Sequence, residues 1–182
     1  MTEQTKKALS LFEVAYGLGH LEKESEIKAL ANLYAVNEMP FNAARLLEKH
    51  IKEGLLEKDA RNYASMANNF HASKEHSSAA KYYGEAYAFS KDIAHLSKQA
   101  TLLLTAENYK AAVTVYKKAL SVAKSKKGRL HMGLMESYFY QNKFKEAYQQ
   151  VILAMNDPQT RRTARAWKGF IEGKAKNNGV TL

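Results

Sequence analysis

Two short clusters of cationic side chains are the residues of this 182-residue chain whose types and spacing most clearly suit chemistry. Such clusters attract acidic proteins, anionic lipid or nucleic acid. Their contacts weaken as salt screens charge over about 8 to 10 Å. The first cluster is Lys124, Lys126, Lys127 and Arg129, and the second is Arg161, Arg162 and Arg165. We expect both to lie on one basic edge of the fold, because they fall one structural repeat apart.

The net charge of +10 comes entirely from the C-terminal part of the chain. Residues 1–100 hold 13 Lys and Arg against 13 Asp and Glu, whereas residues 101–182 hold 15 against 5. This asymmetry predicts one basic end. A solvated surface that only keeps the protein in solution is the alternative explanation, since charge runs commonly serve that purpose.

No pattern in the sequence predicts an enzyme, a cofactor or a metal site. The chain has no cysteine, which rules out disulfides, cysteine nucleophiles and cysteine metal ligands. Its six histidines form neither an HExxH motif nor a pair spaced i, i+4. Gly17 and Gly19 follow no strand, so they indicate a helix end rather than a phosphate loop. No serine or threonine lies in a nucleophile-elbow motif. We therefore expect a protein that is not an enzyme.

Neither a membrane span nor a linker is visible along the chain. No uncharged apolar stretch approaches the ~18 residues that a spanning helix needs, and the start MTEQTKKALSLF lacks the features of a signal peptide. The only prolines are Pro40 and Pro158, and no segment is rich in Gly, Ser and Pro. We expect a soluble chain with one continuous domain over residues 1–182.

A repeat of about 35 residues organises the sequence. A small residue followed four positions later by a bulky one recurs five times, at intervals of 35, 36, 33 and 35 residues. Self-similarity at this period is typical of a solenoid of stacked helical units. The five pairs are Ala8 and Phe12, Ala43 and Leu47, Ala79 and Tyr83, Ala112 and Tyr116, and Ala147 and Val151.

A second recurring segment lies between these pairs. Its bulky residues are Tyr34, Phe70, Leu103 and Tyr138. The i, i+3, i+4, i+7 spacing of apolar residues predicts helices, and short turns make neighbouring helices antiparallel. Asp59, Asp92 and Thr160 are expected to cap helix starts. The expected elements are a helix at 4–18, helix pairs at 24–54, 59–90, 93–123 and 127–156, and a capping helix at 159–176.

The pattern resembles the tetratricopeptide repeat (TPR), whose unit of about 34 residues places small residues in both helices. FKEAYQQVILAMNDP matches at Phe144, Ala147, Ala154 and Pro158, and YKAAVTVYKKAL matches from Tyr109 onwards. The usual first-helix tryptophan is absent, and the repeat around Phe41 has an extra turn residue. The resemblance implies an all-α, right-handed superhelical solenoid that serves as a protein-binding scaffold.

In TPR arrays the first helices of successive pairs line a concave groove, which takes an extended peptide or a partner helix. Some of these positions are alternatively only solvated. Lys28, Asn32 and Lys98 match three of the five positions of the family's carboxylate clamp, but Ser65 and Ala94 do not, so we expect no clamp. The groove candidates are Lys28, Asn32, Arg61, Asn68, His71, Ser97, Lys98, Thr101, Arg129, Glu136 and Tyr140.

A closer resemblance involves two segments, PFNAARLLEKHIKEGLLEKDARNY and RRTARAWKGFIEGKA. Both look like the C-terminal part of bacterial TPR proteins assigned to the TonB energy-transduction system. The matching residues are Pro40, Ala43, Leu47 and Glu48 in the first segment and Arg161, Arg162, Ala164 and Trp167 in the second. The resemblance implies a TonB-linked envelope transport assembly in the periplasm. Without it, a cytoplasmic location is expected.

The two ends of the array differ. Ala8, Phe12 and Ala15 match the second helix of a repeat, yet no first helix precedes them, so we expect a fragment of a longer protein and self-association through this half-repeat. At the other end Trp167, with Ala164, Phe170 and Ile171, forms an apolar stripe expected to cap the last repeat.

Three hypotheses follow from the sequence. The first is a scaffold that binds other proteins through the groove or the basic edge. The second is a nucleic-acid-associated protein that uses the basic C-terminal half, although no aromatic residues interleave with the basic clusters to stack on bases. The third is a structural adaptor whose ends stack on other repeats.

Overall fold

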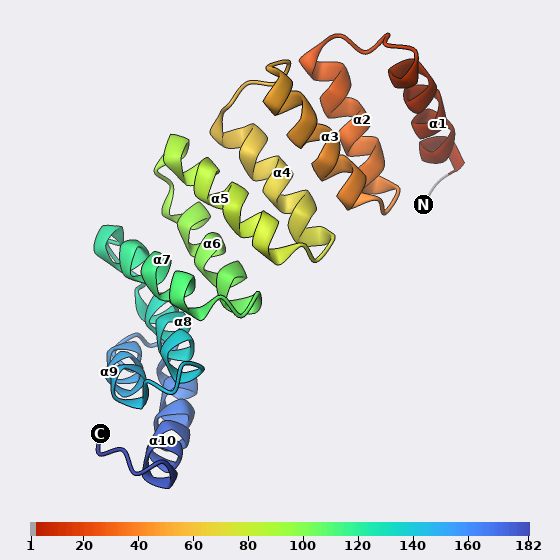
Figure 1. Cartoon of the computed structure of the whole chain (residues 1–182). Coiled ribbons are helices and arrows are strands. Elements are labelled where there is room, and N and C mark those ends of the chain that lie inside the picture. The colour runs from red at the N-terminus through yellow and green to blue at the C-terminus, as the bar shows by residue number, and fades with distance from the viewer. Residues whose placement is uncertain (1–2) are drawn as a thin grey trace. The chain divides into compact units, whose positions relative to one another are not determined.

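The computed structural model describes residues 3–182, and every regular element in that range is an α-helix (Figure 1). The helix bounds differ from the ranges expected from the sequence by at most two residues. The helices are α1 Glu3–Gly17, α2 Glu24–Val36, α3 Pro40–Glu53, α4 Ala60–Ala72, α5 His76–Ser90, α6 Ile93–Thr105, α7 Tyr109–Val122, α8 Gly128–Phe139, α9 Phe144–Ala154 and α10 Arg161–Asn177.

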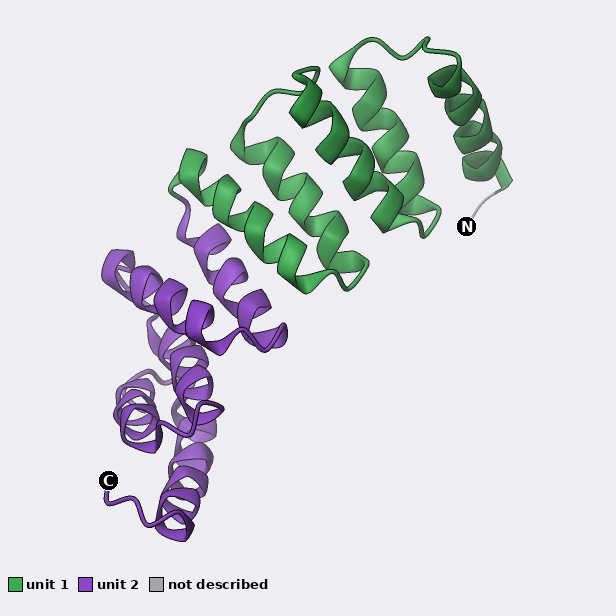
Figure 2. Ribbon diagram, in the orientation of Figure 1, with its two compact units in different colours: residues 1–91 green, residues 92–182 purple. Residues whose placement is uncertain are grey.

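The chain divides into two compact units, one ending at Lys91 and the other beginning at Asp92 (Figure 2). The first unit contains α1 to α5, and the second contains α6 to α10. Within each unit, consecutive helices joined by short turns pack against each other in antiparallel pairs. The expectation of a single continuous array over residues 1–182 stays a prediction.

The turn inside each helix pair has the same construction four times. A residue with left-handed φ follows each first helix, and the next amide donates to the carbonyl five residues earlier in the chain. This closure is the Schellman motif, which satisfies carbonyls that a helix end leaves free. The four left-handed residues are Glu38, Lys74, Glu107 and Asn142, with φ between 58° and 63°. The four accepting carbonyls belong to Tyr34, Phe70, Leu103 and Tyr138, at 2.9 to 3.0 Å.

The recurring alanines lie where helices cross. Ala43, Ala79, Ala112 and Ala147 are all 0% exposed, and each bulky partner four residues later is buried as well. Helices approach to about 8 to 10 Å only where the contact side chains are small. The small-and-bulky register predicted from the sequence is therefore confirmed for the four complete pairs.

Helix α1 is less completely covered than the later second helices. Ala8, Phe12 and Ala15 are only partly buried, because no first helix packs on them within the described residues. Tyr16 makes polar contacts between α1 and α3: its hydroxyl lies 2.9 Å from His50 Nε2 and accepts from Lys49 Nζ at 2.8 Å. The repeat predicts a small residue at position 50 or 51, where this chain has His50 and Ile51, and both of these larger side chains are buried.

The last helix buries a different stripe from the one expected. Ala164 and Ile171 are buried as predicted, and Ala175 joins them. Phe170 is 50% exposed, so its assignment to the buried stripe was wrong. It directly precedes Ile171, which places it about 100° around the helix axis from the buried stripe, and it contacts Phe139, with ring centroids 5.3 Å apart. Trp167 is half-buried and contacts the same ring.

The expected helix caps are only partly correct. The Asp59 carboxylate accepts from the Asn62 amide at 2.7 Å, and the Asp92 carboxylate accepts from the Ala94 amide at 2.8 Å. Thr160 occupies the N-cap position of α10, but its hydroxyl donates to the Ala154 carbonyl at 2.6 Å instead. This hydroxyl therefore ties α10 to the end of α9.

One glycine inside α8 permits a close contact between α7 and α8. A Cβ atom on Gly133 would lie 2.2 Å from Tyr116 Cζ and 2.3 Å from its hydroxyl oxygen. Tyr116 is buried, and its ring lies directly against the α8 backbone. Any larger residue at position 133 must displace this ring.

We expect Gly133→Ala to lower the free energy of unfolding by about 1 to 3 kcal/mol, because the added methyl group overpacks the contact with Tyr116. Gly169→Ala is the matched control, since nothing lies within 4 Å of a Cβ there. Alanine in an open helical position raises stability by up to about 1 kcal/mol. Denaturant unfolding of both variants measures the difference. Changes of the same sign and size would contradict this account of the packing.

Candidate functional site

The groove candidates lie on the first helices of the four pairs. Lys28, Ser97 and Glu136 are partly buried, and the other groove candidates are exposed. They are distributed as Lys28 and Asn32 on α2, Arg61, Asn68 and His71 on α4, Lys98 and Thr101 on α6, and Arg129, Glu136 and the adjoining Tyr140 on α8.

In the first unit, a polar network joins α2 and α4. Lys28 pairs with Glu24 of its own helix at 2.5 Å, and Glu24 also accepts from Asn62 at 3.1 Å. These two hydrogen bonds lower the pKa of Glu24. Asn62 is 2% exposed and was not predicted from the sequence as a site residue. Lys28 is thus engaged within its own unit.

Two tyrosines of the second helices extend their hydroxyls to predicted groove residues. Tyr83 donates to the Asn68 side-chain oxygen, and the Tyr116 hydroxyl lies 3.3 Å from Thr101 Oγ1. Both tyrosines occupy the bulky position of the repeat. The first and last pairs have Leu47 and Val151 there, which carry no polar group. The groove position beside Val151 is Glu136.

Glu136 is a half-buried carboxylate on α8. Burial raises its pKa, and neither a hydrogen bond nor an ion pair within residues 3–182 satisfies the carboxylate. Burial is also the main cause of the raised pKa of Tyr116, to which the nearby Glu136 charge adds. The α6–α8 surface therefore contains an unpaired acid close to a tyrosine hydroxyl.

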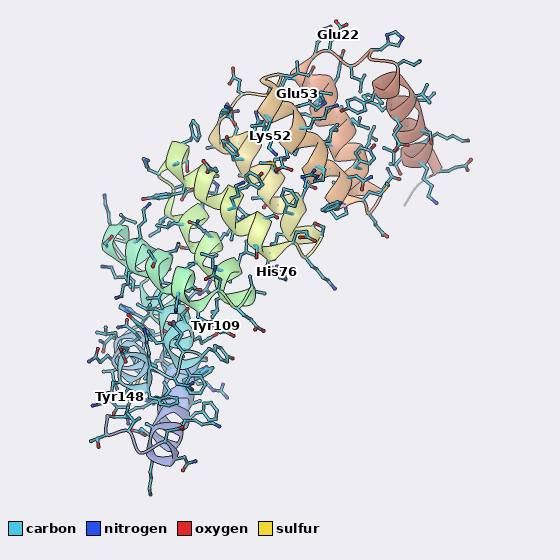
Figure 3. All side chains as sticks on the ribbon, in the orientation of Figure 1. Glu22, Lys52, Glu53, His76, Tyr109 and Tyr148 are labelled. Carbon is cyan, nitrogen blue, oxygen red and sulfur yellow. The ribbon has the colours of Figure 1, made fainter. Side chains whose placement is uncertain are left out.

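An exposed aromatic residue lies beside this acid. The Tyr140 amide donates to the Glu136 carbonyl at 3.0 Å, which places Tyr140 one turn further along. Its side chain is 52% exposed. One face of its ring stacks on Tyr109, with ring centroids 5.2 Å apart and planes 20° from parallel. Tyr109 begins α7 and is labelled in Figure 3. We call Thr101, Tyr116, Glu136 and Tyr140 the α8 polar site.

The two basic clusters lie at neighbouring turns of the second unit. Asp157 links them, because its carboxylate accepts from the Gly128 amide at 3.1 Å. A hollow of about 390 Å³ lies between the turns and is lined by Lys126, Lys127 and Asp157 among others. Arg161 is partly engaged, since its Nε donates to the Met155 carbonyl at 3.1 Å. All seven cationic residues are exposed.

Asp157 changes the chemistry expected of this edge. The sequence predicted a basic edge from its cationic clusters alone, and the structure adds the Asp157 carboxylate beside Gly128. That carboxylate also accepts from the Gln159 amide at 2.9 Å, so backbone donors hold it in place. The use of this edge as a binding surface stays a prediction.

A further hollow in the first unit was not predicted from the sequence. It has a volume of about 490 Å³, and Tyr16, Tyr34 and Lys49 are among its lining residues. Burial, followed by a hydrogen bond to Glu13, raises the pKa of Tyr34 to about 12. Lys49 Nζ donates to the Tyr16 hydroxyl at 2.8 Å. The surface cations here are therefore already partly engaged.

Within residues 3–182, no group of three or more His, Asp and Glu side chains is arranged to hold a metal ion. None of the described helices is long and apolar enough to cross a membrane.

No family model matches the chain, and no curated protein matches it in sequence. Solved structures do match it. YrrB, described as a TPR protein with an unusual peptide-binding site, has a TM-score of 0.68 at 15% identity, over 91% of this chain and 84% of that one. The C-terminal part of a TPR protein from Cytophaga hutchinsonii has a TM-score of 0.68 at 10% identity, over 96% and 68%. MamA from Desulfovibrio magneticus RS-1 has a TM-score of 0.65 at 13% identity, over 82% and 84%.

These likenesses show the fold. The chain is an all-α, TPR-like solenoid of helix pairs, as its repeat predicted.

We expect Glu136→Gln to be more stable than the parent protein at neutral pH. Because burial raises the pKa of Glu136 in the folded state, the folded protein holds this proton more tightly than the unfolded chain. The tighter hold on this proton stabilises the folded parent protein fully below the ordinary glutamate pKa of 4.5, and this stabilisation is lost as the pH rises through the pKa of the folded state. The difference between variant and parent should therefore be near zero in acid and grow towards neutral pH.

Denaturant unfolding as a function of pH measures this effect. Glu107→Gln provides the control, since Glu107 is an exposed acid of the same unit. A parent protein that is more stable than Glu136→Gln at neutral pH would mean that Glu136 has a stabilising partner.

Proposed function

We propose that this protein is a scaffold that binds other proteins, and that the α6–α8 surface takes an extended segment of the partner. The observation that carries the proposal is that polar side chains recur at one repeat position of the first helices. Asn32, Asn68 and Thr101 are exposed there, and Glu136 is half-buried. Packing does not require polar groups at these positions.

The α8 polar site suits peptide recognition. Hydroxyl and carboxylate groups from Thr101, Tyr116 and Glu136 offer hydrogen-bond partners, and Tyr140 offers apolar area beside them. An extended peptide needs both, because its backbone groups must be satisfied and its side chains supply affinity. The fold similarity to YrrB, a TPR protein with a peptide-binding site, supports the same function here.

The basic edge is a second candidate contact for an acidic region of the same partner. Lys124, Arg162 and Arg165 are exposed, and charge attraction of this kind increases the rate of association. Asp157 lies between the two clusters and reduces their combined charge. We therefore assign recognition to the groove and place the basic edge in a supporting role.

The narrower hypothesis is a TonB-linked envelope assembly in the periplasm. Its support is the resemblance carried by the segments that begin at Pro40 and Arg161. Genes for TonB, ExbB and ExbD beside this one, together with an export signal upstream of Met1, would support it. Neighbouring genes of unrelated function would contradict the TonB-linked hypothesis and leave the broader scaffold proposal unchanged.

A peptide selected from a random display library on the immobilised chain provides the test. We expect Tyr140→Ala to weaken its binding by about fivefold or more, the usual effect of removing an aromatic anchor. Phe89→Ala is the matched control, because Phe89 is also exposed and stacks on a tyrosine, Tyr63, at 5.7 Å. Titration calorimetry gives both affinities.

Equal losses in the two variants would contradict groove binding at α8. A joint change of Lys126, Lys127, Arg161 and Arg162 to Gln that abolishes binding, while Tyr140→Ala does not weaken it, would transfer recognition to the basic edge. Salt-sensitive binding of unrelated DNA by the parent, lost in that joint variant, would favour nucleic acid as the partner.

A further inference from the structure

We propose that Glu136 and Tyr140 form a subsite for the guanidinium group of an arginine in the bound segment. This inference rests on the proposed function and specifies what the α8 polar site selects. It concerns a cationic ligand, although the second unit is itself strongly basic.

The carboxylate of Glu136 is the unusual feature of this unit. Residues 101–182 contain five acids and 15 cations. Glu172 pairs with Lys168 at 2.6 Å, and Asp157 accepts from backbone amides. Glu136 is partly buried, yet no lysine or arginine of the described chain pairs with it. Burying an unpaired carboxylate disfavours folding, so its presence is explained if the partner supplies the cation.

The aromatic ring of Tyr140 favours arginine among cations. One face of the ring stacks on Tyr109, and the side chain remains 52% exposed. A planar guanidinium stacks on an aromatic face and directs its N–H groups sideways in the same plane. Glu136, one turn away, lies where such N–H groups can donate. A lysine ammonium is a point charge without a plane to stack, so it fits this pair less well.

Neighbouring hydroxyls supply further acceptors. A guanidinium has five N–H donors, more than one carboxylate accepts. The Tyr116 hydroxyl and Thr101 Oγ1, 3.3 Å apart, lie at the same surface. Gly133 fixes the Tyr116 ring against α8, because even a methyl group at this position would collide with it. The acceptors are therefore held in place before a ligand arrives.

Arg129 is the resident cation on the same helix face, seven residues before Glu136. Two helical turns separate them, which is about 10.5 Å along the axis. No ion pair joins them. Arg129 is thus positioned to take an acidic group of the same peptide, while Glu136 takes the basic one.

The test uses three short peptides, acetyl-Gly-Gly-X-Gly-Gly-amide with arginine, citrulline or lysine at X. Citrulline has the shape of arginine without its charge. Backbone amide shifts of Gly133, Glu136 and Gln141 are followed by NMR on the whole chain, at low and moderate salt. We expect saturable binding of the arginine peptide in the millimolar range. Citrulline should bind at least about fivefold more weakly, the effect of losing one charge-assisted hydrogen bond, and lysine should be intermediate.

Glu136→Gln should abolish the preference for arginine over citrulline. Glu107→Gln, an exposed acid of the same unit, should keep it. Equal binding of arginine and citrulline by the parent overturns the subsite, as does an unchanged preference in Glu136→Gln. The subsite is also overturned if the arginine peptide shifts the amides beside exposed acids throughout the chain and leaves those of Gly133, Glu136 and Gln141 unchanged.

The outcome separates the subsite from the scaffold proposal. If the library-selected peptide binds at Tyr140 but tolerates citrulline or alanine at each arginine, the scaffold proposal stands and the arginine subsite fails. If neither the selected peptide nor the short peptides change the α8 amides, both fail.

Discussion

The close approach of helices at alanine is the constraint on which this structure depends. Ala43, Ala79, Ala112 and Ala147 are fully buried at the crossings, and there is no room for a larger side chain at such distances. The bulky residue four positions later then fills the space between the helices of a pair. Since both requirements recur every 33 to 36 residues, one local rule is sufficient to build every pair. The α8 polar site depends on this rule, because Tyr116 occupies the bulky position of its pair and extends its hydroxyl from there to Thr101.

The fold could be predicted from the sequence because its determinants recur in every repeat. A single repeat that departs from the pattern does not obscure the period. Individual contacts were not predictable in this way. Asn62 and Asp157 act through partners 38 and 29 residues away, and no local pattern identifies such partners. The close contact at Gly133 was predictable in principle, since a glycine inside a helix often indicates close packing. Phe170 was misplaced because apolar type alone does not distinguish a buried helix face from its neighbour.

The candidate site likewise contains features that the repeat predicts and contacts that it does not. The register placed Thr101, Glu136 and Tyr140 on one surface of the first helices, and the structure brings them together with a hydroxyl from the second helix. The isolation of Glu136 among many cations was not visible in the sequence, because charge composition does not reveal which acid lacks a partner. The basic edge was located by charge alone, and charge did not reveal that Asp157 lies within it.

The left-handed residues of the four turns have a consequence for protein engineering. Glu38, Lys74 and Glu107 adopt a conformation that glycine adopts without strain, and an L-residue pays about 1 kcal/mol or more to do so. Their side chains are exposed, so no packing opposes a change. Glycine at these three positions, none of which belongs to the α8 polar site, is therefore expected to raise thermal stability. A more heat-resistant version of the protein could be made in this way with Thr101, Tyr116, Glu136 and Tyr140 left unchanged.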